Sequence, residues 1–239
     1  MSKPTITEHT GATPSAIAAY ISQALRTAIA ERGRASLAVS GGQSPIPMFK
    51  VLSAQDLDWS RVHIVLVDER IVAHNHDASN TALVTRHLLQ NQATAAHFVP
   101  FFREPTPVVN ADALSALVQD ATDRIADLPW PLDIAVLGMG EDGHTASLFP
   151  NAPGYAHAIT TGKRLAWVVP EQAPIPAPHA RLSLTLHALL QTRELLLCIG
   201  SAVKLAVYRS AAQRQKADPA LPISLILHQT QTPVSVWIT

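Results

Sequence analysis

The chain has 239 residues, of which 47% are hydrophobic and 15% are charged, so it can bury a large core. Basic and acidic residues number 18 each, and this balance excludes a global field that would draw the protein to nucleic acid or to an anionic membrane. No apolar run reaches the ~18 residues of a membrane helix, and the N-terminus lacks the apolar core of a signal peptide. We therefore expect a soluble, cytoplasmic protein with a single domain over residues 1–239.

Helix and strand signals alternate through the first half of the chain. Apolar residues recur at spacings of three and four positions before Gly33, a pattern typical of one helix face followed by a C-terminal stop. In chain order, the predicted elements are a helix over 14–32, a strand over 36–39, a glycine-rich turn that opens a helix to about 52, a strand over 61–67 that ends in Asp68-Glu-Arg70, a helix starting at Ser79-Asn80, a short strand within 98–102, and a helix over 112–128.

The same alternation continues to the C-terminus. The predicted elements are a strand over 132–137, a loop after Pro150, a strand over 165–169, a helix near 185–191, a strand over 194–199, a helix after Gly200 that carries Lys204, and a last strand over 234–238. Proline-bearing loops are expected over 103–109 and up to about Pro178, the second of which delivers Arg181. Such alternation predicts an α/β fold with three layers, in which helices cover both faces of a mostly parallel, twisted sheet.

Cys198 is the only cysteine, so no disulfide can form within the chain. It lies in the apolar run Leu195-Leu-Leu-Cys-Ile199, where a buried, unreactive thiol is expected.

The stretch Gly138-Met-Gly-Glu-Asp-Gly-His-Thr-Ala-Ser-Leu-Phe-Pro150 follows a predicted buried strand. In open α/β sheets, ligands bind at the carboxyl ends of the strands. A carboxylate beside an imidazole fixes the tautomer of the ring and stabilises its protonated form, so Asp142 and His144 are predicted to act as a catalytic pair. Asp142 is equally suited to cap a short helix that begins at His144, and both roles can hold together.

Glycines 138, 140 and 143 also match G-x-G-x-x-G, which is typical of dinucleotide binding. Such a motif needs a long helix after the third glycine and an acidic residue ~20 positions later. Pro150 interrupts that helix, and Lys163-Arg164 stand near the place where the acid is needed. The sequence therefore argues against a nucleotide cofactor.

Phosphate-binding features occur in several turns. The loop Ser40-Gly-Gly-Gln-Ser44 can present backbone N–H groups to an anion, although a tight turn without a ligand fits it equally well and the Lys-Ser/Thr ending of a Walker loop is missing. Arg70, Arg181 and Lys204 each lie at a strand or loop end, where one sheet edge could gather them around a phosphate dianion. Each of them alone is more often a solvated surface residue.

Ligand-type residues are close together in His74-Asn-His76-Asp77. Without a third well-placed group of ligands, we interpret this segment as a polar loop rather than a metal site.

Taken together, five blocks resemble the 6-phosphogluconolactonase family, in the family's order and over nearly the whole chain. They are Ser40 to Pro45, Val67 to Arg70 with Ser79-Asn80, Gly138 to Pro150, Arg181 to Thr185, and Gly200 to Lys204. The block from Met139 to Pro150 is the specific one. The resemblance implies a Rossmann-like fold and a carboxylic ester hydrolase that converts 6-phospho-D-glucono-1,5-lactone to 6-phospho-D-gluconate, the second step of the oxidative pentose phosphate pathway.

The resemblance also implies which residues form the site. His144 and Asp142 would be catalytic, without a metal or cofactor. The residues implied in substrate and phosphate binding are Ser40, Gly41, Gly42, Gln43, Asp68, Arg70, Asn80, Gly138, Gly140, Gly143, Arg181 and Lys204. The expected partner is a small sugar-phosphate lactone rather than nucleic acid or a membrane, for a monomer or a small homo-oligomer.

Two alternatives remain open. Glucosamine-6-phosphate deaminases share the glycine loop and the Asp-Gly-His turn, but they carry a glutamate where this chain has Phe149 and typically a tyrosine where it has Arg70. A sugar-phosphate sensor without catalytic activity is the second alternative. The chain shows no predicted DNA-binding helix pair and no basic surplus, which disfavours a regulator of that kind.

Overall fold

The structure is a computed structural model that describes residues 6–103, 110–170 and 179–239. Its main sheet has seven strands in the order β1-β10-β9-β6-β2-β3-β5, and each neighbouring pair is parallel. The strands are β1 (Ile6–Thr10), β2 (Ala35–Val39), β3 (Val62–Leu66), β5 (His97–Val99), β6 (Leu132–Leu137), β9 (Thr192–Ile199) and β10 (Val234–Ile238). The predicted parallel sheet is confirmed.

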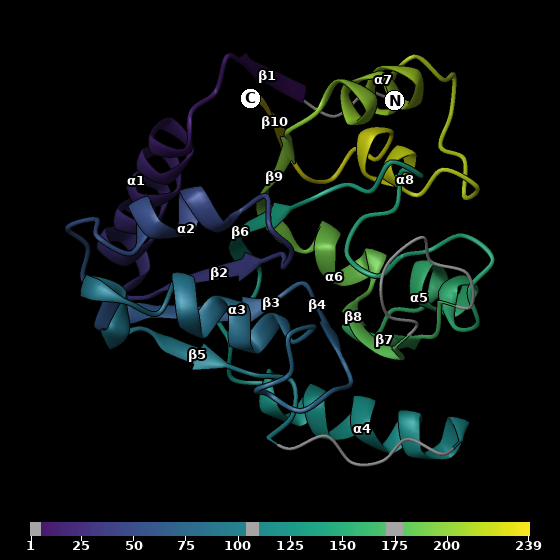
Figure 1. Ribbon diagram of the computed structural model, residues 1–239, viewed down its shortest axis with the longest axis horizontal. Helices are drawn as coiled ribbons and strands as arrows, with labels where there is room; N and C mark the ends of the chain where they lie inside the picture. Colours follow the sequence, from purple (N-terminus) through teal and green to yellow (C-terminus); the bar gives the residue numbers. More distant parts are fainter. Residues whose placement is uncertain (1–5, 104–109, 171–178) are drawn as a thin grey trace.

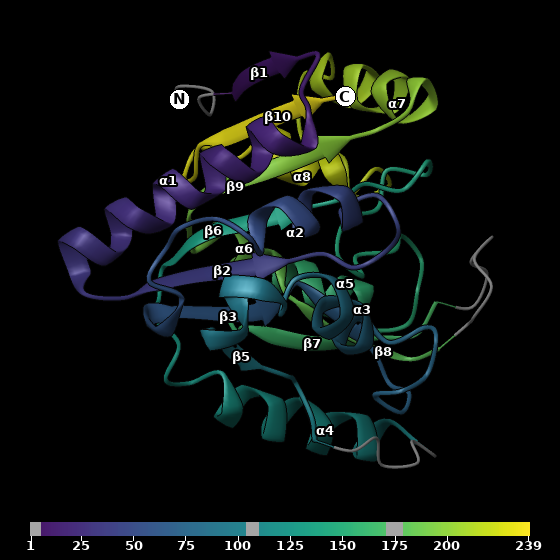
Figure 2. The ribbon, with the colours of Figure 1, turned by 60° about the vertical axis from the view of Figure 1, so that its left-hand side comes forward.

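Helices cover both faces of this sheet, which confirms the three-layer arrangement. Helices α1 and α2 lie on one face, and α6 and α8 lie on the other (Figures 1 and 2). The helices are α1 (Pro14–Arg32), α2 (Ile46–Leu52), α3 (Asn80–His87), α4 (Ala111–Arg124), α5 (Tyr155–Thr160), α6 (Leu186–Leu190), α7 (Ala202–Ala212) and α8 (Ile223–Leu227), with 3-10 turns at Trp59–Arg61 and Asn91–Ala95. Among the described helices, none is long and apolar enough to cross a bilayer.

Local signals define α1 at both ends, and the sequence predicted the one at Gly33. The Thr13 hydroxyl accepts a hydrogen bond from the N–H of Ala16, and Pro14 occupies the first turn, where its missing N–H has no cost. Gly33 ends the helix in the left-handed region, with φ of 75°. The face that carries Ile21 and Leu25 is fully buried in the core.

A second, three-stranded antiparallel sheet was not predicted. It consists of β4 (Asp68–Arg70), β8 (Arg181–Leu184) and β7 (Leu165–Val168), in the order β4-β8-β7. The strand expected over 61–67, ending in Asp68-Glu-Arg70, is therefore divided between β3 of the main sheet and β4 of this one. Arg181, expected at the end of a loop, is the first residue of β8. The sequence predicted β7, as a strand over 165–169, but β4 and β8 show too little alternation to be recognised as separate strands.

Other departures are local. The loop expected after Pro150 contains α5, and β1 and α8 were not predicted. The short helix suggested after Asp142 does not form; instead residues 144–149 make turns, with a β-bridge between Thr145 and Leu148. The short strand expected within 98–102 is β5, at 97–99. Most of the proline-bearing loop over 103–109, and the loop up to Pro178, lie outside the described residues.

The order in which strands are added to the main sheet reverses at its centre, between β2 and β6. The chain continues from β2 to the adjacent β3 on one side, whereas β6 is followed in the sheet by β9 on the other side. The loops that leave the carboxyl ends of β2 and β6 therefore diverge and open a crevice between them. These loops are the two glycine-rich turns that the sequence singled out.

Candidate active site

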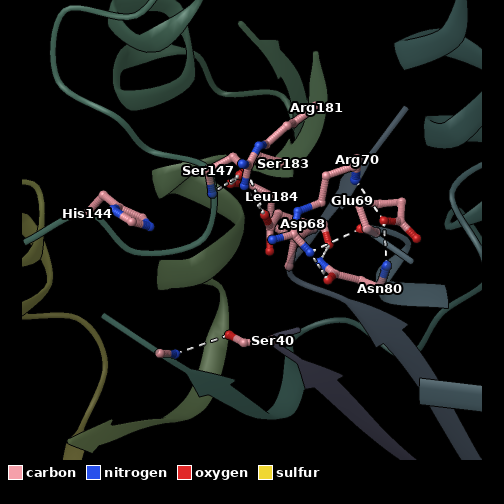
Figure 3. Close-up of polar contacts among 12 residues, drawn as sticks. Ser40, Asp68, Glu69, Arg70, Asn80, His144, Ser147, Arg181, Ser183 and Leu184 are labelled. Carbon is pink, nitrogen blue, oxygen red and sulfur yellow. Dashed lines mark hydrogen bonds and ion pairs between the residues drawn. The ribbon is translucent and has the colours of Figure 1, made fainter. Parts of the chain in front are cut away.

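A cavity of about 490 Å³ lies at this crevice. Its wall combines the loop after β2, the turn after β6, the strands β4 and β8, and the first part of α7. All the predicted site residues line it except Gly143: they are Ser40, Gly41, Gly42, Gln43, Asp68, Arg70, Asn80, Gly138, Gly140, Asp142, His144, Arg181 and Lys204. Figure 3 shows how several of these side chains lie relative to one another.

The turn after β6 holds Asp142 and His144 in direct contact. The imidazole Nδ1 lies 2.5 Å from Oδ1 of Asp142, and the N–H of His144 donates to the same oxygen at 3.1 Å. Gly140 lies beneath the ring, where a Cβ would come within 2.2 Å of Nδ1. Because Nδ1–H is held by a carboxylate, Nε2 is the ring nitrogen left to exchange protons in the cavity.

The ionisation of Asp142 fits this geometry. Partial burial acts to raise the pKa of Asp142, but the hydrogen bonds and the charge of His144 outweigh it, so the pKa is lowered. Asp142 is therefore a carboxylate at neutral pH and can stabilise an imidazolium on His144.

Gly143 is the one predicted site residue that does not line the cavity, and it shapes the turn instead. Its φ is 78°, and a Cβ there would lie 2.3 Å from Cδ1 of Leu221. Its carbonyl accepts the N–H of Ile223 at 2.9 Å, which anchors the turn to α8. The missing side chain serves close packing rather than ligand binding.

Two arginines meet across the small sheet. Arg70 of β4 and Arg181 of β8 are directly paired, and Arg181 is 3% exposed. Nη1 of Arg181 lies 3.7 Å from Oδ2 of Asp68, while its Nε is buried with no hydrogen-bond partner among the described residues. Burial and the nearby Arg70 lower the pKa of Arg181, against the opposing effect of Asp68. This guanidinium has an unmet capacity to donate hydrogen bonds.

Asn80 and Arg70 form a second contact in this wall. The Arg70 guanidinium donates to Oδ1 of Asn80 and, at 3.2 Å, to the carbonyl of Ala78. The Asn80 amide donates to the carbonyl of Asp68 at 2.8 Å. Gly41 permits this packing, because a Cβ there would stand 1.8 Å from Oδ1 of Asn80.

Sequence reasoning overlooked Glu69, which holds this wall together. Its carboxylate accepts the N–H of Asn80 at 2.8 Å and that of Thr81 at 2.7 Å, and so caps α3 from another element. Burial raises the pKa of Glu69, although these hydrogen bonds act to lower it. The only sequence signal was an acid inside the Asp-Glu-Arg block, and this signal could not reveal a bond to a helix that begins eleven positions later.

The loop after β2 and the N-terminus of α7 complete the cavity. The Ser40 hydroxyl donates to the carbonyl of Val136 at 2.9 Å and accepts the N–H of Gly138 at 3.1 Å, so Ser40 ties the two loops together. Gly42 adopts a φ of 87°, as a tight turn requires. Lys204 reaches the cavity from the first turn of α7, which Ser201 caps.

Two further sequence predictions concern Cys198 and the loop that carries His74 and His76. Cys198, which was expected to be buried, is half-buried and lines the cavity from β9, and desolvation raises the pKa of its thiol to about 12. The rings of His74 and His76 have different neighbours, Phe102 and His179 respectively. Across the three described segments, no group of three or more His, Cys, Asp or Glu side chains has the arrangement of a metal site.

Comparison with known proteins places this site in a family. Residues 9–237 match the family of glucosamine-6-phosphate isomerases and 6-phosphogluconolactonases. The chain belongs to this family. A 6-phosphogluconolactonase of Neisseria meningitidis is 43% identical to it, over 89% of this chain and 88% of that protein. The crystal structure of a 6-phosphogluconolactonase from Shewanella baltica is 37% identical and covers 100% of this chain and 99% of its own, with a TM-score of 0.86.

The fold extends to the other branch of the family. A monomeric glucosamine-6-phosphate deaminase superimposes with a TM-score of 0.72 at 18% identity, covering 98% of this chain and 97% of its own, and this shows a shared fold alone. In this chain the ring centroid of Phe149 lies 4.1 Å from that of His144, and the Arg181 guanidinium lies 5.0 Å from the Phe149 centroid. Phe149 cannot donate or accept a proton.

Proposed function

We propose that the chain hydrolyses 6-phospho-D-glucono-1,5-lactone to 6-phospho-D-gluconate, with His144 as the general base. The observation that carries the proposal is one cavity in which the Asp142–His144 pair faces the same space as Arg70 and Arg181. An imidazole suited to proton transfer thus stands opposite cations suited to a phosphate dianion. The naming of relatives up to 43% identical as 6-phosphogluconolactonases supports the same reaction.

In the proposed reaction, Nε2 of His144 takes a proton from water as the water oxygen attacks the lactone carbonyl carbon. The resulting imidazolium, stabilised by Asp142, returns that proton to the ring oxygen as the acyl C–O bond breaks. The product is a carboxylic acid and a free hydroxyl, and His144 is again neutral. Proton transfer of this kind contributes ~10²- to 10⁴-fold in rate. No step requires a metal or a cofactor.

The polar groups around His144 divide into two proposed roles. The N–H groups of Gly138, Gly140 and Gly143 already donate to protein acceptors, whereas those of Met139 and Glu141 have no acceptor among the described residues. The latter two are therefore the better candidates to stabilise the developing oxyanion. Arg70, Arg181, Lys204 and the amides of the Gly41–Gln43 turn would hold the 6-phosphate and so orient the carbonyl.

Separate assays with two substrates test the proposal. Fresh 6-phosphogluconolactone and glucosamine 6-phosphate are supplied in turn, while acid release and ammonia release are followed against blanks without enzyme. Acid release alone, lost in His144→Ala, supports the lactonase. Ammonia release would instead establish the deaminase, and binding of either compound without turnover would establish a sensor.

A further inference from the structure

Ser147 lies between the two halves of the site without lining the cavity. Its side chain is 0% exposed, and it belongs to the same turn as His144. Its hydroxyl donates to Oδ2 of Asp68 at 2.6 Å, and its N–H donates to Oγ of Ser183 at 3.2 Å. Asp68 and Ser183 are themselves paired across β4 and β8. Ser147 therefore joins the catalytic turn to both strands that carry the arginines (Figure 3).

The contact with Asp68 also reaches Arg181. The carboxylate oxygen that accepts the Ser147 hydroxyl is the one that lies 3.7 Å from Nη1 of Arg181. Asp68 is 6% exposed, so water cannot readily replace a lost partner. The position of the carboxylate, and of the guanidinium beside it, thus depends on a hydroxyl supplied by the catalytic turn.

We propose that Ser147 is a positioning residue that fixes the distance between His144 and the Arg70–Arg181 pair. This inference rests on the proposed function. A substrate held by its phosphate at one end can present its carbonyl to His144 only when that distance matches its length. A misplacement of ~1 Å can cost about a hundredfold in rate. A lactone without a phosphate is not held at that end, so the distance does not matter to it.

This prediction distinguishes a positioning role from a merely structural one. Loss of folded protein lowers turnover of every substrate by the same factor. Loss of the correct distance lowers turnover of the phosphorylated lactone alone, and it leaves the arginines able to bind inorganic phosphate.

The test compares Ser147→Ala with Ser36→Ala. Ser36 is a matched control because it is also 0% exposed and its hydroxyl also lies within hydrogen-bond distance, 3.2 Å, of a buried aspartate, Asp133. It stands near the amino end of β2, away from the carboxyl ends of the strands where the cavity opens. For each variant, kcat and KM are measured with 6-phosphogluconolactone and, at high enzyme concentration, with D-glucono-1,5-lactone, after subtraction of spontaneous hydrolysis. Inhibition by inorganic phosphate and thermal unfolding are measured alongside. If Ser147→Ala does not fold, Ser183→Ala takes its place in the test, because it removes the acceptor of the Ser147 N–H.

For Ser147→Ala, we expect kcat with the phosphorylated lactone to fall about 10- to 100-fold. Its activity on the unphosphorylated lactone and its phosphate inhibition should stay within about twofold of wild type, and Ser36→Ala should change both activities equally. Three results for Ser147→Ala would overturn this inference without affecting the proposed function. They are equal losses of activity on the two lactones, an unchanged kcat with the phosphorylated lactone, and phosphate inhibition that weakens together with kcat. A wild-type protein inactive on 6-phosphogluconolactone would overturn the proposed function, and this inference with it.

Discussion

Arg70 and Arg181 lie directly opposite each other in the antiparallel pair of β4 and β8, so two positive charges share one wall of the cavity. Like charges placed opposite each other destabilise a strand pair. Here Arg181 forms an ion pair with Asp68, and the Arg70 guanidinium donates a hydrogen bond to Asn80. Asp68 and Glu69 both act on Arg181, and the cavity wall still presents two guanidinium groups side by side, an arrangement that favours an anionic ligand.

Substitution of His144 should abolish most turnover. In His144→Ala, we expect kcat to fall by ~10²- to 10⁴-fold with KM little changed, because the ring moves a proton but does not hold the phosphate. Asp142→Asn should also lower kcat, since an amide cannot stabilise the imidazolium as a carboxylate does. Steady-state acid release measures both. The exposed His157 of α5 provides the control, and wild-type rates in His144→Ala would refute the assignment.

Removal of Arg181 should weaken substrate binding rather than chemistry. A hydrogen bond to a charged group contributes ~1.5–3 kcal/mol, so Arg181→Ala should raise KM and the phosphate inhibition constant about 10- to 100-fold. The variant should also unfold at a lower temperature, because Asp68 stays buried beside the lost charge. Arg193→Ala, at a half-exposed arginine that pairs with Asp133, is the control. An unchanged phosphate inhibition constant would contradict the role of Arg181.

The space above Gly41 should be essential for phosphate binding. In Gly41→Ala, the added methyl group must displace Asn80, and with it the partner of Arg70. Overpacking costs ~1–3 kcal/mol, so we expect KM to rise about tenfold while kcat changes less. Gly162→Ala adds a methyl group where nothing lies within 4 Å, and it should behave as wild type. Equal KM values for the two variants would count against this packing argument.

Glu69 should make stability fall as the pH rises. Its folded-state pKa is raised by burial, so the folded protein holds this proton more tightly than the unfolded chain does. The contribution of this group to the free energy of unfolding is greatest below the ordinary glutamate pKa, and it is lost as the pH rises through the raised value. Glu69→Gln should therefore gain stability relative to wild type as the pH increases across that window.

Thermal unfolding at a series of pH values measures this difference. The exposed Glu141, changed to glutamine, is the control. A Glu69→Gln variant that loses stability relative to wild type over the same pH increase would show that the hydrogen bonds from Asn80 and Thr81 outweigh burial.

The Cys198 thiol should be unreactive in the folded protein. With its pKa raised to about 12, almost none of it is thiolate at pH 8, and only the thiolate is alkylated. Iodoacetamide should therefore modify the chain in denaturant but not in buffer, as followed by intact mass. Equal labelling rates in the two conditions would show that the thiol is accessible.

Much of the main sheet was predictable from local sequence. Strand β6 stands where a short β-branched run lies between Pro131 and Gly138, and α1 begins and ends at its capping residues. The wall formed by β4 and β8 was not predictable, because such short strands carry no periodic signal. The packing of Gly143 against Leu221 was not predictable either, because a glycine motif does not say whether a missing side chain makes room for a ligand or for a neighbouring residue.

By itself, the sequence determined the Asp142–His144 pair, since two residues within one turn meet through backbone geometry that their immediate neighbours dictate. Only the tertiary structure decided what stands opposite that pair. Arg70 and Arg181 come together through strand register, and Ser147 reaches Asp68 through packing between segments far apart in the chain. Such contacts depend on how whole elements pack against a shared core. No local pattern of residues encodes the distance between His144 and the two arginines.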